Sequence, residues 1–211
     1  MLVLHILTFI MKMNSPYIAS FTLAGMLSIL TIVFRNYEFL LYALTVLVLI
    51  VILYKTDHYF KYNKTGLWLF NIWLVLHILG GLASYQGVRL YDLILLDIVG
   101  EPYNILKYDQ FVHFYCYLVI SILMWSVVDK ITKIKASRVV VCTVTILAAS
   151  SLGAVNEIIE FLAVVAFSSD GVGGYINTTI DLVANLFGAI VGTLYMNNKY
   201  NRYDSITSQH T

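Results

Sequence analysis

Two acidic side chains lie inside an apolar run that is long enough to cross a lipid bilayer. The run covers residues 138–167 and contains Asn156, Glu157 and Glu160. An ionised carboxylate in the hydrocarbon of a membrane costs at least ~2.5 kcal/mol, so two of them on one helix need stabilising partners. Their spacing of three residues places Glu157 and Glu160 on one face of a helix. We expect this face to point toward other polar helices rather than toward lipid.

Other apolar runs of the chain carry polar residues that could be those partners. Asp109 and His113 are four residues apart, as are Asp181 and Asn185, so each pair shares one helix face. His77 lies within a further apolar run. We predict that six side chains form one site: His77, Asp109, His113, Glu157, Glu160 and Asp181. The residues expected to support this site are Asn156, Asn177, Asn185, Gly80, Gly81 and Gly188.

Three kinds of chemistry fit this set of residues. The carboxylates could be partly protonated and hydrogen-bond to the histidines and asparagines, which would only fix the packing of the helices. Two imidazoles and up to four carboxylates also match the ligands of a divalent metal such as Zn, Mn or Fe. Finally, neighbouring carboxylates with a histidine could perform acid/base chemistry or proton transfer without a metal, with Glu157, Glu160, Asp109 and Asp181 as the catalytic groups. The residue types leave these alternatives open.

The composition of the chain identifies an integral membrane protein. Of its 211 residues, 60% are hydrophobic and 12% charged, and its mean hydropathy is +0.81, outside the range of soluble globular chains. The net charge of +1 gives no basic field for binding nucleic acid. The lipid bilayer is therefore the expected environment, and the sequence does not specify an oligomeric state.

The apolar runs predict an all-α, polytopic fold with six transmembrane helices. The expected spans are residues 17–34, 37–54, 67–85, 108–128, 138–167 and 176–196. We expect a single membrane domain over residues 1–211. Residues 1–66 would form peripheral helices, with 37–54 packing against lipid, residues 67–196 a four-helix core that bears the site, and residues 197–211 a cytoplasmic tail. Residues 1–13 are apolar but short, which favours an interfacial or re-entrant segment.

The positions of the basic residues predict how the helices are oriented. Placing the N-terminus in the cytoplasm puts ten Lys and Arg residues on the cytoplasmic side and only Arg35, Arg89 and Lys107 outside. Both termini are thus predicted to be cytoplasmic in a multi-pass protein of the cell membrane. With a rise of about 1.5 Å per helical residue, the six site residues then fall within one band of the outer leaflet.

The same residues resemble a known family. His77 to Gly81 with Tyr85, the segment from Tyr108 to Phe114, the segment from Asn156 to Phe161, and the segment from Asn177 to Ala189 occur in the order seen in the YjdF-like inner-membrane proteins. The VanZ-like membrane proteins are more distantly similar. The resemblance implies a polytopic membrane protein of the cell envelope and adds Tyr85 to the supporting residues. Where the family pattern has an acid four residues before Asp181, this chain has Asn177, which removes one charge.

The sequence therefore leads to a working hypothesis with two rivals. We expect the site to bind or process an envelope lipid or a lipid-linked molecule, with Glu157 or Glu160 as base or ligand and His77 and His113 as ligands or proton carriers. The first rival is a small transporter or a component of a proton or ion path. The second is a structural membrane protein whose polar network only fixes the packing of its helices.

Overall fold

Six long helices form the part of the protein that the structure describes, as the apolar runs predict. The computed structural model describes residues 13–132, 137–167 and 173–207. Within these residues the helices are α2 (Ser15–Val33), α3 (Tyr37–Phe60), α4 (Lys64–Leu82), α5 (Tyr108–Ile131), α6 (Arg138–Phe167) and α7 (Tyr175–Thr207). Each is long and apolar enough to cross a membrane. The predicted all-α, multi-pass architecture is confirmed.

Several helix ends differ from the prediction for local reasons. Helix α3 continues past residue 54 to Phe60 and stops where Lys61 adopts a left-handed conformation with φ of 54°. Helix α4 begins at Lys64 because the Asn63 side chain accepts hydrogen bonds from the backbone N–H groups of Thr65 and Gly66, at 2.9 and 3.3 Å. Helix α7 runs on to Thr207, so the predicted polar tail is helical over most of its length. Of the predicted interfacial segment 1–13, residues 1–12 lie outside the described residues.

The segment between α4 and α5 folds back over one end of the bundle. Two short antiparallel strands, β1 (Ser84–Tyr85) and β2 (Val88–Arg89), form a hairpin whose turn residues Gln86 and Gly87 have φ of 52° and 82°. The short 3-10 helix η1 (Leu90–Asp92) follows. This segment joins the third and fourth of the predicted spans.

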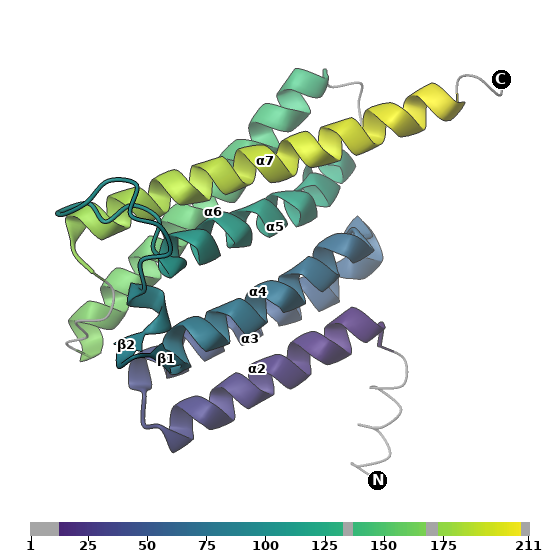
Figure 1. Ribbon diagram of the computed structural model, residues 1–211. Coiled ribbons are helices and arrows are strands. Elements are labelled where there is room, and N and C mark those ends of the chain that lie inside the picture. The colour runs from purple at the N-terminus through teal and green to yellow at the C-terminus, as the bar shows by residue number, and fades with distance from the viewer. Residues whose placement is uncertain (1–12, 133–136, 168–172, 208–211) are drawn as a thin grey trace, which may run out of the picture.

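Helix α5 lies at the centre of the bundle and packs most closely on α7 (Figure 1). A Cβ atom at Gly188 would lie 2.1 Å from the carbonyl oxygen of Phe114, and one at Gly192 would lie 2.2 Å from that of Leu118. Only glycine therefore allows the two backbones to approach so closely. Gly188, one of the predicted supporting residues, thus lies in the contact between α5 and α7.

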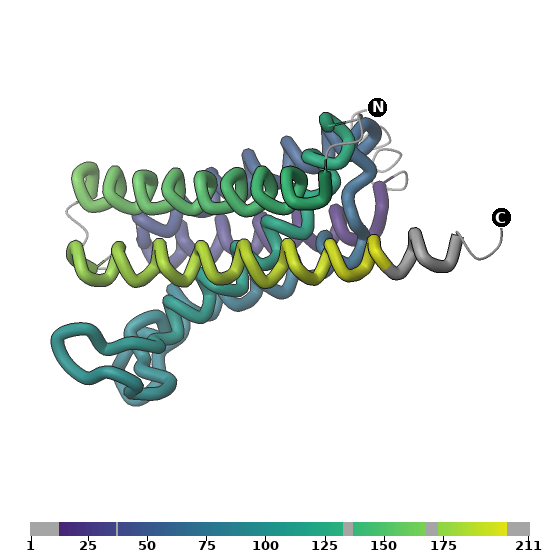
Figure 2. Tube along the Cα trace, turned by 90° about the horizontal axis from the view of Figure 1, so that it is seen from above, coloured from purple at the N-terminus to yellow at the C-terminus, as the bar shows by residue number. Residues whose placement is uncertain are grey.

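The two ends of the bundle differ in what they carry. Helix α2 begins and α7 ends at the same end, whereas the hairpin lies at the opposite end, where α5 and α7 begin (Figures 1 and 2). Asp109 and Asp181 lie within about 10 Å of the starts of α5 and α7 at that end, and Glu160 lies about as far from the end of α6. The bundle therefore brings the polar residues of three helices to one depth.

Candidate functional site

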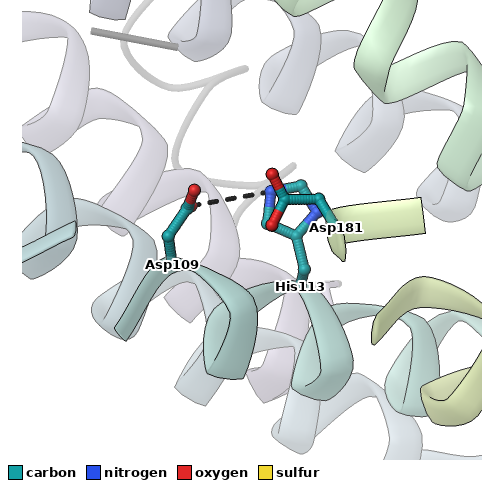
Figure 3. Close-up of side chains that lie close together, drawn as sticks. All are labelled: Asp109, His113 and Asp181. Carbon is teal, nitrogen blue, oxygen red and sulfur yellow. Dashed lines mark ion pairs between the residues drawn. The ribbon is translucent and has the colours of Figure 1, made fainter. Parts of the chain in front are cut away.

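His113 is the centre of the polar cluster. It lies on α5, is only 7% exposed, and has Asp109 one turn before it on the same helix. Its Nε2 atom is 3.6 Å from Oδ1 of Asp109, as the dashed line in Figure 3 marks. Asp181 reaches the same imidazole ring from α7 (Figure 3) and is fully buried.

Helix α6 supplies two further carboxylates to His113. Oε1 of Glu160 is 3.6 Å from Nε2 of His113, and Oε1 of Glu157 is 3.4 Å from Nδ1. Glu157 is 7% exposed. Gly153, one turn before Glu157, leaves room for Asn185 of α7, since a Cβ at Gly153 would lie 3.0 Å from Nδ2 of Asn185. Three helices thus place four carboxylates around one imidazole.

Three asparagines hold these charged groups in position. Nδ2 of Asn177 donates to Oδ2 of Asp181 at 2.6 Å and to Oδ2 of Asp109 at 3.3 Å, so it bridges two carboxylates. Nδ2 of Asn156 donates to Oε1 of Glu160 at 2.6 Å. Asn177, the position where this chain has an amide in place of an acid, therefore stabilises the cluster by donating to both neighbouring acids.

The hydrogen bonds of Asn185 define the tautomer of a neutral His113. Nδ2 of Asn185 donates to Oε1 of Glu157 at 3.4 Å, which turns its Oδ1 toward Nδ1 of His113 at 3.0 Å. An amide oxygen only accepts, so Nδ1 carries the hydrogen. The lone pair of Nε2 then faces Asp109 and Glu160. At 3.6 Å these oxygens are too far for a hydrogen bond, but ligands around a tetrahedral ion with bonds of 2.0–2.2 Å lie about 3.3–3.6 Å apart.

Two carboxylate oxygens in the cluster have no hydrogen-bond partner among the described residues. They are Oδ1 of Asp181 and Oε2 of Glu157, and both are buried. An unsatisfied charged oxygen in a low-dielectric interior is costly unless a proton or a cation neutralises it. Two groups of atoms meet the spacing needed for metal ligands: Asp109, His113 and Asp181 form one, and His113, Glu157 and Glu160 form the other.

His77 lies in the wall of the same cavity but outside both groups of possible ligands. Its ring is stacked between Phe39 and Trp73, with centroid distances of 5.6 and 5.4 Å. Nδ1 of His77 is 2.5 Å from the hydroxyl of Tyr91, whereas Nε2 is buried without a partner among the described residues. The structure therefore joins five of the six predicted site residues, and stacked aromatic rings hold the sixth apart from them.

Tyr91 is a residue of the cavity wall that the sequence prediction missed. It lies in η1, outside the membrane spans, and burial raises the pKa of its hydroxyl well above the ordinary value, with further contributions from Asp109 and Glu160. The hydroxyl therefore stays protonated and can donate to Nδ1 of His77. No spacing pattern linked Tyr91 to His77, because the chain between them forms the hairpin.

Two of the predicted supporting glycines, Gly80 and Gly81, lie close to the surroundings of His77, whereas Tyr85 does not line the cavity. A Cβ at Gly80 would clash with the ring of Tyr91, and a Cβ at Gly81 with the ring of Phe39, so both glycines make room for the surroundings of His77. Tyr85 is 59% exposed in β1 and does not line the cavity. Its supporting role stays a prediction, with Tyr85 placed in the hairpin directly after α4.

The cluster opens into a cavity of about 250 Å³. Asp109, His113 and Glu160 line one part of it, together with Glu38 and Arg89. Side chains of α3 line the cavity as well, although the sequence predicted only packing against lipid for the second span. Glu38, an acid in the first turn of that span, was the one signal that could have pointed to this wall.

The chain belongs to a family known from its sequences. Residues 15–202 match the model of a family described as Predicted membrane protein (DUF2238), which covers most of the chain and all six candidate membrane spans of the described residues. This membership agrees with the resemblance to the YjdF-like proteins, whereas no comparison supports the more distant VanZ-like resemblance. No curated protein and no solved structure matched the chain.

Proposed function

We propose that this member of the predicted membrane protein family binds a divalent cation beside His113 and uses it to bind or process the polar head of an envelope lipid or lipid-linked molecule. The observation that supports this most is the geometry around Nε2 of His113. Its Nε2 atom is 3.6 Å from Oδ1 of Asp109, and Asp109, His113 and Asp181 have the spacing of ligands of one ion, in a part of the membrane where uncompensated acids are costly.

His113, Asp109 and Asp181 would hold the ion, and Oδ1 of Asp181 is buried without a hydrogen-bond partner among the described residues. One imidazole with several carboxylates suits Zn, Mn or Fe. A bound cation there would polarise a phosphoryl or carbonyl oxygen of the substrate. Glu157, whose Oε2 is free of hydrogen bonds in the described chain, would act as the base.

The basic residues of the chain support a site on the outer side of the membrane. Among the described residues, the end of the bundle away from the cluster has at least twice as many basic residues as the end near it. The former has Lys55, Lys61, Lys64, Lys130, Arg138 and Lys199, and the latter has Arg35, Arg89 and Lys107. With that end outside, the cluster lies in the outer leaflet, where lipid head groups are within reach.

Elemental analysis of the purified protein tests the cation. We expect about one Zn, Mn or Fe ion per chain in the wild type and a marked loss in Asp109→Asn. Glu38→Gln is the matched control, because Glu38 lines the same cavity but belongs to neither group of ligands. Occupancy should fall as the pH is lowered, since protons compete for the histidine and the carboxylates. A wild-type protein without stoichiometric metal would remove the proposal.

A proton or ion path is the second candidate, and one observation favours it. On the far half of α7, Thr193 is fully buried, and its Oγ1 and the Oδ1 of Asn197 have no partner among the described residues. Such groups suit internal water molecules. Proteoliposomes distinguish this candidate: a proton or cation flux that Glu160→Gln abolishes would support it, whereas the absence of any flux in the wild type would exclude it.

A further inference from the structure

We infer that this site binds a phospholipid of the surrounding bilayer, and that one acyl chain of this lipid enters the cavity sideways between α3 and α6. The position of its head group rests on the proposed function. The entry of the chain rests on the shape and lining of the cavity, which are independent of any metal.

The cavity is polar at one end and apolar along the rest of its length. Glu38, His113 and Glu160 line the polar end, and Leu49, Ile120 and Leu152 line the apolar part. From Glu38 to Leu49 the α3 backbone advances eleven residues, or about 16 Å, away from the polar end. An apolar space of this kind does not retain water but accepts hydrocarbon. The two parts together match a molecule with a polar head and an apolar chain.

The apolar part opens directly onto the lipid. Val48 of α3 and Leu152 and Val155 of α6 line the cavity and are 51%, 39% and 48% exposed, whereas Val112 and Ile120 deeper in the cavity are nearly buried. Helices α3 and α6 make few contacts with each other, so the opening lies between two membrane spans. The molecules present at such an opening are acyl chains of the bilayer, and no soluble substrate reaches it.

Arg89 and the cation proposed beside His113 are the groups at the polar end that a phosphate-bearing head group would contact, since the other charged lining residues there, Glu38, Asp109 and Glu160, are acidic. Arg89, which is paired with Asp92 at 3.0 Å, lines the cavity near Asp109 and Glu38. A cation beside His113 would add further positive charge. A phosphate group between Arg89 and this cation would contact both. The acyl chains of the same lipid would stay at their ordinary depth in the membrane.

Photo-crosslinking tests whether the chain enters. The full-length protein is placed in phosphatidylcholine nanodiscs that contain phosphatidylglycerol with a diazirine near the end of one acyl chain, and the labelled residues are mapped by mass spectrometry. Val112 and Ile120 of α5 line the cavity but are only 3% and 8% exposed, so lipid outside the bundle does not reach them. We expect label at Ile120 in the wild type, in addition to label on the outer surface.

Paired substitutions at the opening supply the control. Val48→Trp with Val155→Trp should block the opening and abolish the label at Ile120. Val51→Trp with Val144→Trp changes the same two helices at sites that are 40% and 41% exposed but do not line the cavity, and should leave the label unchanged. Because all four positions face lipid, both double variants should fold and melt like the wild type.

The outcomes separate this inference from the proposed metal site. An unlabelled Ile120 in the wild type, with normal label on the outer surface, overturns it, as does equal label at Ile120 in the two double variants. Label at Ile120 that only the variant at the opening loses supports it even in a protein that contains no metal. In that case the proposed cation fails and the lipid site stands.

Discussion

The chemistry available to His113 depends on a hydrogen bond that leaves one of its nitrogens free. Asn185 accepts from Nδ1, so Nε2 presents its lone pair to Asp109 and Glu160. Partners of this kind are common around histidine ligands of metals, because they fix both the tautomer and the orientation of the ring. Asn185 thus acts through His113 and is a positioning residue.

Replacing Asn185 should weaken metal binding without removing a ligand. In Asn185→Leu the ring of His113 loses its acceptor, and we expect the affinity for Mn²⁺ or Zn²⁺ to fall by about 10–100-fold. Asn197→Leu, three turns further along α7, is the control and should bind with wild-type affinity. Calorimetric titration measures both. Equal affinities of Asn185→Leu and the wild type would show that the contact does not orient His113.

The contacts of single residues were predictable from the sequence where their spacing along one helix determines which side chains meet. Asp109 and His113 meet because they are four residues apart on α5, and Glu157 and Glu160 meet His113 because acids within a span must face the interior. The aromatic rings around His77 were not predictable. Phe39, Trp73 and Tyr91 come from three separate segments. In a membrane protein, the type of an apolar or aromatic residue does not indicate whether its side chain faces lipid or the interior of the bundle.

The contact between α5 and α7 determines where Asp181 and Asn185 lie relative to His113. Gly188 and Gly192 bring the backbone of α7 against that of α5 directly beyond the cluster. Any side chain at these positions has to push the helices apart, and the distances around His113 would lengthen with them.

Gly188→Ala should therefore lower both stability and metal binding. Its new Cβ would lie 2.1 Å from a backbone carbonyl, which cannot rotate away, and overpacking of this kind costs about 1–3 kcal/mol. Gly25→Ala on α2 is the matched control, because nothing lies within 4 Å of a Cβ there, and its melting temperature should be unchanged or slightly higher. If the thermal melts of Gly188→Ala and Gly25→Ala coincide, α5 and α7 can move apart without loss of stability, and this prediction is wrong.

The helices themselves were predictable, but some of their ends and the hairpin were not. An apolar run marks the part of a helix that crosses the membrane, and a helix continues into water until a local cap stops it, as Lys61 stops α3. The strands β1 and β2 are two residues each, and the turn at Gln86 and Gly87 that joins them has no distinct pattern of hydrophobicity.

The loops at the two ends of the bundle differ in their content of basic residues. From this difference we propose that both termini are cytoplasmic. The excess of Lys and Arg near the end where α2 begins supports this orientation. It places the hairpin and the cluster at the outer face.

Labelling of single cysteines in intact cells checks this orientation. In a chain without Cys116 and Cys142, Gln86→Cys in the hairpin should react with a membrane-impermeant maleimide. Asn63→Cys, in the loop between α3 and α4, should react only after the cells are permeabilised. The reverse pattern would place the cluster in the inner leaflet and would contradict the proposed access from outside.

The convergence of three helices on His113 is the feature on which the proposed function depends, and it can be measured at the metal. Pulsed electron paramagnetic resonance of the protein loaded with Mn²⁺ detects nitrogen bound to the ion. We predict the signal of one imidazole nitrogen, which His113→Gln abolishes and His77→Gln leaves intact. A spectrum without coupled nitrogen in the wild type, or a signal that depends on His77 and not on His113, would contradict the account.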